Sequence, residues 1–196
     1  PVHQLVATGT GWCERLVAYE EECFVPVTGP LIGDAAVPEA LQHAPPGTIL
    51  ETSPASLSIV RELAARLAKQ GGAALIVDYG HERSSLGETL QAVASHAYAS
   101  PWDEPGERDL TAHVDFQALI EAAREERVRV FGPKTQGEWL KAMGIDVRAA
   151  ALAQASPHLE RGIAIARDRL TRDDEMGRLF KVVALVAQDW PEPVAF

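Results

Sequence analysis

The stretch GAALIVDYGH, residues 72–81, decides the fold. Its apolar part, Ala73 to Val77, is too short for a helix and shows no polar–apolar alternation, which predicts a parallel strand buried on both faces of a sheet. A helix is predicted just before it, because Ser53-Pro54 is a typical helix start and apolar residues recur at helical spacing until Gly71-Gly72. Helix followed by buried strand is the repeating unit of an α/β protein.

The same alternation continues toward the C-terminus. Short apolar strands are predicted at 128–131 and 179–186, with Lys181 as the only charge in the second. Helices are predicted after an Asp115 cap, after a capping box at 135–138, over 146–155, and from Ser156-Pro157. The sequence therefore predicts an α/β layered architecture.

The residues before this region are organised differently. Residues 3–7, 12–19 and 23–27 alternate with turn signals and predict an antiparallel β meander over residues 1–28. A Gly- and Pro-rich loop is expected over 29–50, and the α/β region over 51–196. Residues 82–110 are polar and rich in turn formers, which predicts a long functional loop.

Composition narrows the function classes. The 196 residues carry a net charge of −10, a field that repels phosphate backbones, so we expect no nucleic-acid partner. No apolar run approaches the roughly 20 residues that cross a bilayer, so we expect no membrane span. Two cysteines, Cys13 and Cys23, are too few for a disulfide scaffold, which favours a reducing compartment, although a Cys13–Cys23 disulfide remains an alternative. They do not form a Cys-x-x-Cys pair and the histidines have no metal-ligand spacing, so we expect no bound metal.

The best candidate chemistry follows the strand at 73–77. In open α/β sheets ligands collect at the carboxyl ends of strands, where Asp78, Tyr79, Gly80 and His81 stand. Asp78 could accept hydrogen bonds from a donor-rich substrate, Gly80 permits close approach, and His81 could move a proton near neutral pH. The alternative is that Asp78 caps a turn that Gly80 only permits.

A second cluster gathers polar side chains before the helix at 115. Asp109 and Thr111 lie in the loop and are candidates for substrate contact, with His113 and Asp115 beside them. Asp115 could instead be only the helix cap, and His113 a buried, hydrogen-bonded histidine. An acid/base pair could form between Asp78 and His113, or between His81 and Asp109.

Seven stretches, in order along nearly the whole chain, match one family together. They are PVHQ (1–4), GWCER (11–15), ETSPA (51–55), GAALIVDYGH (72–81), DLTAHVDF (109–116), TQGEWL (135–140) and MGRLFKV (176–182). With them the chain resembles the MidA-type class I S-adenosylmethionine-dependent methyltransferases, which include the mitochondrial arginine methyltransferase that assists respiratory complex I assembly. At 87–93 many members have an Arg and a Tyr after the Thr-Leu pair, whereas this chain continues from Thr89-Leu90 with Gln91-Ala92-Val93.

The resemblance implies a class I methyltransferase-like, Rossmann-like sheet, of which the chain supplies the last strands. Members are about twice as long, and their glycine-rich S-adenosylmethionine loop lies in an N-terminal half. We therefore expect this chain to be the C-terminal half of such an enzyme, inactive by itself and unable to bind S-adenosylmethionine. Half a sheet would also leave an unpaired edge and an exposed apolar face, so we expect pairing with itself or with the missing half.

The resemblance also implies roles for the matched residues. Asp78, His81, Asp109 and His113 are the catalytic candidates, and Glu51, Ser53, Tyr79, Gly80, Thr111, Asp115 and Gln136 the substrate-binding candidates. Methylating a guanidinium requires orienting it and removing a proton, for which carboxylates such as Glu51, Asp78 or Asp109 are suited.

The expected function is therefore methyl transfer from S-adenosylmethionine, with a protein arginine as acceptor. The expected partner is a protein substrate such as a respiratory complex I subunit, in the cytoplasm of a bacterium or the mitochondrial matrix of a eukaryote. The main alternative is a non-catalytic domain that binds a partner or assists assembly. A hydrolase using Asp78, His81 and His113 is a weaker alternative, because no nucleophile elbow is present.

Overall fold

The computed structural model describes residues 2–33, 37–94 and 97–196, which form two compact units. Unit 1 comprises residues 1–56 and 84–113, and unit 2 comprises 57–83 and 114–196. The chain leaves unit 2 after the β5 strand, returns to unit 1, and re-enters unit 2 at residue 114. Pro1 of the first matched stretch lies outside the described residues.

The first sheet of unit 1 confirms the predicted meander. Its strands are β1 (His3–Thr8), β2 (Gly11–Glu20), β3 (Cys23–Leu31) and β4 (Ile49–Thr52), in the order β3-β2-β1-β4 and all antiparallel. Trp12 anchors one face: its ring is buried with Leu5, Leu50 and neighbouring apolar residues, and its Nε1 donates to the Gln42 carbonyl at 3.1 Å. The expected loop at 29–50 thus includes the end of β3, the 3-10 helix η2 (Glu39–Leu41) and the start of β4.

The segment expected to be a long functional loop, 82–110, contains short strands. Unit 1 contains a second, three-stranded antiparallel sheet in the order β7-β6-β8, formed by β6 (Gln91–Ala94), β7 (Ala97–Ala99) and β8 (Asp109–Thr111). Strands of three or four residues between polar turns carry too little periodicity to be recognised from the sequence.

The sheet of unit 2 has the order β10-β11-β5-β9, with β5 (Ala73–His81), β9 (Val114–Asp115), β10 (Arg129–Thr135) and β11 (Phe180–Val186). β11 runs antiparallel to both β10 and β5, and β5 is parallel to β9 only at Gly80 and His81. The three predicted strands are therefore confirmed, but the prediction that β5 is parallel along its length was wrong.

One face of β5 is exposed. Ala74 and Ile76 pack against the core, whereas the side chains that alternate with them, Leu75 and Val77, are 50% and 44% exposed. Within the described residues, 73–79 pair only with β11. The prediction of burial on both faces was wrong because the helices cover only the face that bears Ala74 and Ile76.

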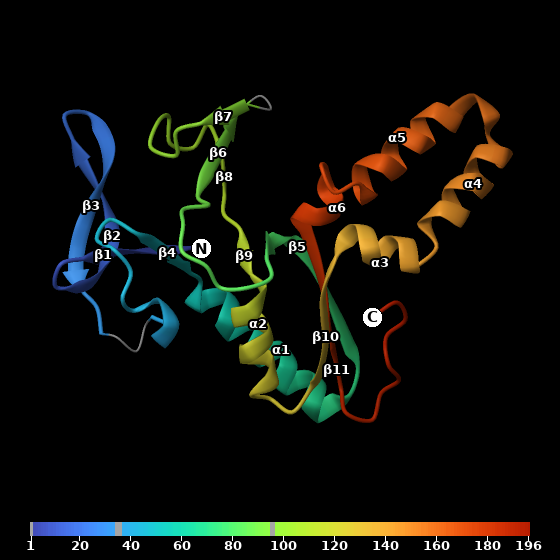
Figure 1. Ribbon diagram of the computed structural model, residues 1–196, viewed down its shortest axis with the longest axis horizontal. Helices are drawn as coiled ribbons and strands as arrows, with labels where there is room; N and C mark the ends of the chain where they lie inside the picture. The colour runs from blue at the N-terminus through green and yellow to red at the C-terminus, as the bar shows by residue number, and fades with distance from the viewer. Residues whose placement is uncertain (1, 34–36, 95–96) are drawn as a thin grey trace. The chain divides into compact units, whose positions relative to one another are not determined.

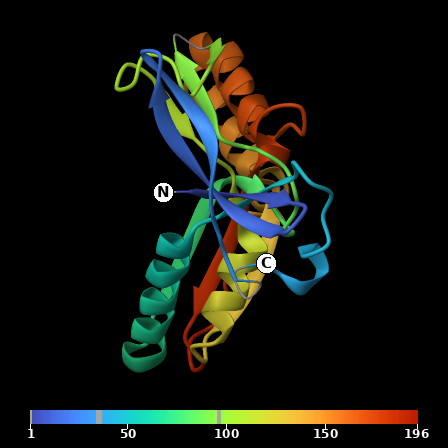
Figure 2. The same cartoon turned by 90° about the vertical axis from the view of Figure 1, so that its left-hand side faces the viewer.

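The covering helices are α1 (Pro54–Gln70) and α2 (Phe116–Arg124), which lie beside the strands in both views (Figures 1 and 2). Val60, Ala64 and Leu67 of α1 share a core with Phe116, Ile120 and neighbours of α2, and with Val183 and Leu185 of β11. Asp115 caps α2 as predicted, accepting from the Ala118 amide at 3.1 Å. The apolar spacing in both helices thus places their buried faces on the same side of the sheet.

The remaining helices follow β10. They are α3 (Gln136–Ala142), α4 (Ile145–Ala155), the 3-10 helix η3 (Pro157–Leu159), α5 (Glu160–Thr171) and α6 (Met176–Leu179). The capping box is confirmed, because Thr135 and Glu138 exchange side chain to backbone hydrogen bonds at the start of α3. The helix predicted from Ser156-Pro157 begins as η3 and becomes α-helical at Glu160.

Candidate functional site

The carboxyl end of β5 positions the first group of candidates. Asp78 is half-buried, and its Oδ1 accepts from the Tyr79 amide at 2.8 Å. The Tyr79 ring meets Phe180 of the neighbouring β11 edge-on, with ring centroids 5.5 Å apart. Asp78 thus fixes the local backbone, while Tyr79 packs against the adjacent strand.

Gly80 lets β5 and β9 approach closely. A Cβ on Gly80 would overlap the Val114 carbonyl oxygen and would stand 2.8 Å from the Val114 nitrogen. Gly80 and Val114 are register partners, as are His81 and Asp115. The glycine therefore brings the next residue on each strand, His81 and Asp115, alongside one another.

His81 and Asp115 form the closest acid/base pair among the predicted residues of unit 2. His81 Nε2 lies 3.9 Å from Asp115 Oδ2, and the two side chains are 25% and 20% exposed. Asp115 accepts the α2 cap bond with its other oxygen, Oδ1. One carboxylate thus serves as the helix cap and as the neighbour of an imidazole that solvent can reach, and an imidazole in such a place can transfer protons.

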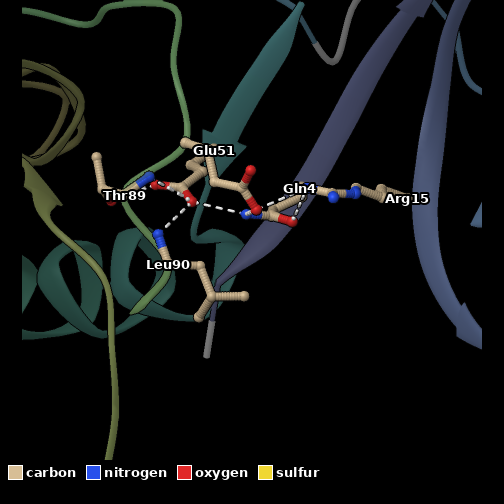
Figure 3. Close-up of polar contacts among 6 residues, drawn as sticks. Gln4, Arg15, Glu51, Thr89 and Leu90 are labelled. Carbon is tan, nitrogen blue, oxygen red and sulfur yellow. Dashed lines mark hydrogen bonds and ion pairs between the residues drawn. The ribbon is translucent and has the colours of Figure 1, made fainter. Parts of the chain in front are cut away.

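A second polar group is centred on Glu51 of β4 in unit 1 (Figure 3). Glu51 Oε1 accepts from three donors: Gln4 Nε2 at 2.8 Å, the Thr89 amide at 3.0 Å and the Leu90 amide at 2.9 Å. Its Oε2 accepts from the Thr89 hydroxyl. Both carboxylate oxygens are therefore engaged by the segment that runs alongside β4.

Arg15 extends this group across the sheet. Its Nη1 donates to Gln4 Oε1 at 3.0 Å and to Glu88 Oε1 at 2.7 Å, and its guanidinium carbon lies 5.7 Å from the centre of the Trp102 ring. Gln4, Arg15, Glu88 and Thr89 were not among the predicted site residues. Gln4 and Arg15 lie in the matched stretches 1–4 and 11–15, and Glu88 and Thr89 lie in the 87–93 stretch where the resemblance to the family is locally altered.

The other unit 1 candidates are placed as follows. The His113 amide donates to Thr89 Oγ1 at 2.8 Å, which links His113 to the Glu51 group. Asp109 begins β8 and is exposed. The Thr111 hydroxyl is buried, and it has no hydrogen-bond partner within the described parts of the chain.

Two predicted substrate contacts have local partners instead. Ser53 Oγ lies 2.7 Å from Ser56 Oγ at the start of α1. Gln136 is buried, 7% exposed, and its amide nitrogen donates to the Leu170 carbonyl at 2.9 Å, which joins the start of α3 to the end of α5. Gln136 therefore contributes to helix packing.

The two acid/base pairings expected from the sequence join different units, since Asp78 and His81 belong to unit 2 and His113 and Asp109 to unit 1. These pairings stay predictions. The pairing of His81 with Asp115 was not predicted, because Asp115 was considered as a substrate contact or a helix cap and not as an acid/base partner.

Within 2–33, 37–94 and 97–196, no three His, Cys, Asp or Glu side chains gather closely enough to hold a metal ion. None of the helices in these ranges is long and apolar enough to cross a bilayer.

Residues 1–134 match a family model described as "Putative S-adenosyl-L-methionine-dependent methyltransferase". The chain belongs to this family. Among curated relatives, it is 34% identical over 189 residues to the human mitochondrial protein arginine methyltransferase NDUFAF7, and 31% identical to the Caenorhabditis elegans homolog. These alignments cover 95% and 94% of the chain but 42% and 44% of the relatives, so the chain spans less than half their length.

Solved structures from Burkholderia thailandensis have the same fold. An uncharacterized protein matches all of this chain with a TM-score of 0.86 at 30% identity, over 54% of its own length. A second member of its superfamily, solved with S-adenosyl-homocysteine bound, matches 95% of this chain with a TM-score of 0.84 at 31% identity, over 50% of its length. The expected methyltransferase-like α/β fold is thereby confirmed.

Proposed function

We propose that this chain is part of a methyltransferase that transfers a methyl group from S-adenosylmethionine to an arginine of a protein. The observation that carries the proposal is the 34% identity to a protein arginine methyltransferase over 95% of the chain. The S-adenosyl-homocysteine bound to a structural relative supports S-adenosylmethionine as the donor, because S-adenosyl-homocysteine is what remains of the donor after transfer.

The starts of α2 and α3, which follow strands β9 and β10, do not fit the methyl donor. A donor with a carboxylate and ribose hydroxyls suits a glycine-rich turn between a strand and a helix, with free amides at the helix start. Here the starts of α2 and α3 are already capped by Asp115 and by Thr135 with Glu138. We therefore assign the chain to the acceptor side of the reaction and propose that the donor is held by residues outside those described.

The chemistry needed on the acceptor side is removal of one proton. A guanidinium nitrogen that gains a methyl group must lose a proton, and a side chain able to take it must be ionisable and accessible. His81 meets both conditions, and its Nε2 lies 3.9 Å from Asp115 Oδ2. Asp78 and Asp109 stay candidates for orienting the guanidinium through charge-assisted hydrogen bonds.

Glu51 has a different role in this proposal. Its oxygens already accept three N–H groups and a hydroxyl, so it is poorly placed to take the proton. Glu51 instead holds residues 89–90 and, through Thr89, the backbone of His113. We propose that Glu51 orders this segment of unit 1 and does not contact the reacting nitrogen.

The finer assignments follow the relatives. The relatives' names give an arginine methyltransferase and a mitochondrial location. From the family resemblance we further propose that the acceptor protein is a respiratory complex I subunit, methylated in the mitochondrial matrix of a eukaryote or the cytoplasm of a bacterium. A second candidate function, partner binding without catalysis, is favoured by one observation, the exposed apolar face of β5 at Leu75 and Val77.

The test uses the native protein expressed from its complete gene, methyl-labelled S-adenosylmethionine, and proteins of the source cell as acceptors. His81→Asn should lower the rate of arginine methylation by about 100-fold or more, with the melting temperature nearly unchanged. The matched control is His158→Asn, since His158 is an exposed histidine in η3 and its replacement should alter neither quantity. Full activity of His81→Asn would remove His81 from the reaction, and absence of methylation in the unmodified protein would favour partner binding.

A further inference from the structure

Lys181 is a buried charge that the acceptor chemistry leaves unexplained. It is 6% exposed and is the only charged residue of β11. Its Nζ donates to three backbone carbonyl oxygens: Arg178 at 2.6 Å, Gly80 at 3.1 Å and Leu179 at 3.4 Å. Within the described residues no carboxylate forms an ion pair with it, and the oxygen Oδ1 of its register partner, Asp78, accepts from the Tyr79 amide.

Burial of this ammonium is costly. Loss of hydration lowers the pKa of Lys181, although the charge of Glu82 partly opposes the shift. An apolar side chain of similar length at this position would avoid the desolvation cost. Side-chain packing alone therefore gives no reason for a lysine, whereas the three carbonyl contacts do.

The contacts join two segments at one point. Arg178 and Leu179 are the last residues of α6, whose terminal carbonyls need donors, and Gly80 is the residue immediately before His81. On its other side, Gly80 lies against Val114 so closely that no Cβ fits. The Gly80 residue is thus held from β11 by Lys181 and from β9 by Val114.

We propose that Lys181 is a positioning residue for the acceptor site: by holding the Gly80 carbonyl, it fixes the direction in which β5 presents His81 to Asp115. The inference rests on the proposed function in one respect, that His81 takes part in the reaction. The claim that Lys181 fixes the position of the His81 imidazole is geometric and does not depend on that function. Lys181 itself does not contact substrate, since its three donors are already used.

The test follows the His81 ring resonances by NMR in the chain labelled at histidine, at one fixed pH, with His81→Gln identifying the signals. Asp115→Asn keeps a residue able to cap α2 and removes the carboxylate charge, so it provides the reference change. Lys181→Met should move the His81 resonances in the same direction, by roughly half the reference change or more, and the double variant should move them little further than the larger single change. If Lys181→Met instead acted on His81 only through the lost ammonium charge, its change in the His81 resonances would add to the change caused by Asp115→Asn.

Lys181→Gln is measured in parallel, because it removes the charge but keeps a hydrogen-bond donor. The test then remains valid if the Lys181→Met variant does not fold. The control is Lys134→Met, which removes a lysine of the same sheet whose Nζ donates to the Ala195 carbonyl at 3.0 Å. Unchanged His81 resonances in the folded Lys181 variants, or additive changes in the double variant, would overturn the proposal. The NMR experiment does not measure methyl transfer. Unchanged His81 resonances would therefore not contradict the proposed function, and absence of methylation would not contradict the positioning role of Lys181.

Discussion

At the residue scale, the candidate site depends on a few positions that admit little change. Gly80 has no room for a Cβ because the Val114 backbone occupies that space. Asp115 divides its two oxygens between the α2 cap and His81. The sequence pattern marked Gly80 as a place of close approach, and the structure identifies what approaches it as the backbone of β9.

Gly80→Ala should therefore destabilise unit 2 by about 2–3 kcal/mol or more, because the methyl group must push β9 away from β5. Gly162→Ala is the control: Gly162 lies in α5 with nothing near the added methyl, so the change should be neutral or stabilising by up to about 1 kcal/mol. Chemical denaturation of both variants measures the difference. Equal stability of the two variants would show that the β5–β9 contact yields easily.

At the element scale, the segment after β5 is attached to the first sheet of unit 1. The Gly87 amide donates to the Ile49 carbonyl at 2.8 Å, and the amides of Thr89 and Leu90 donate to the Glu51 carboxylate. A side-chain carboxylate thus serves as acceptor along the edge of β4. This attachment fixes the start of the 84–113 segment, which carries Asp109, Thr111 and His113.

Glu51→Ala should leave two amides without their acceptor, and hydrogen exchange of the Thr89 and Leu90 amides should quicken at least about 10-fold, equivalent to about 1.4 kcal/mol of lost protection. Glu107→Ala removes an exposed glutamate of the same segment and should leave both exchange rates unchanged. If exchange at residues 89 and 90 is the same in both variants, Glu51 does not hold the segment.

Local patterns predicted most individual elements but not their partners. The spacing of Val60, Ala64 and Leu67 and the capping box at Thr135 predicted α1 and the start of α3 correctly, since both are determined within one or two helical turns. The wholly apolar run at 73–77 predicted a strand but gave the wrong direction and burial, because both depend on which strand lies beside it. The Glu51 contacts with Thr89 and Leu90 span 38 and 39 residues and have no signature in local sequence.

At the scale of the whole molecule, the chain combines a conserved family fold with surfaces that suit further association. Leu75 and Val77 form an exposed apolar face on β5. Within the described residues, most of this strand pairs with a neighbour on one side only, β11. The chain spans 42% of the human relative's length. The net charge of −10 would favour approach of a cationic acceptor such as an arginine-rich segment.

The most direct test of the central claim is the chemical identity of the methylated product. Native protein, expressed from its complete gene, is incubated with S-adenosylmethionine carrying a labelled methyl group and with proteins of the source cell. The modified residue is then identified by mass spectrometry after complete hydrolysis. The account predicts methyl groups on the guanidinium nitrogens of arginine; label on another residue type, or no transfer at all, would contradict it.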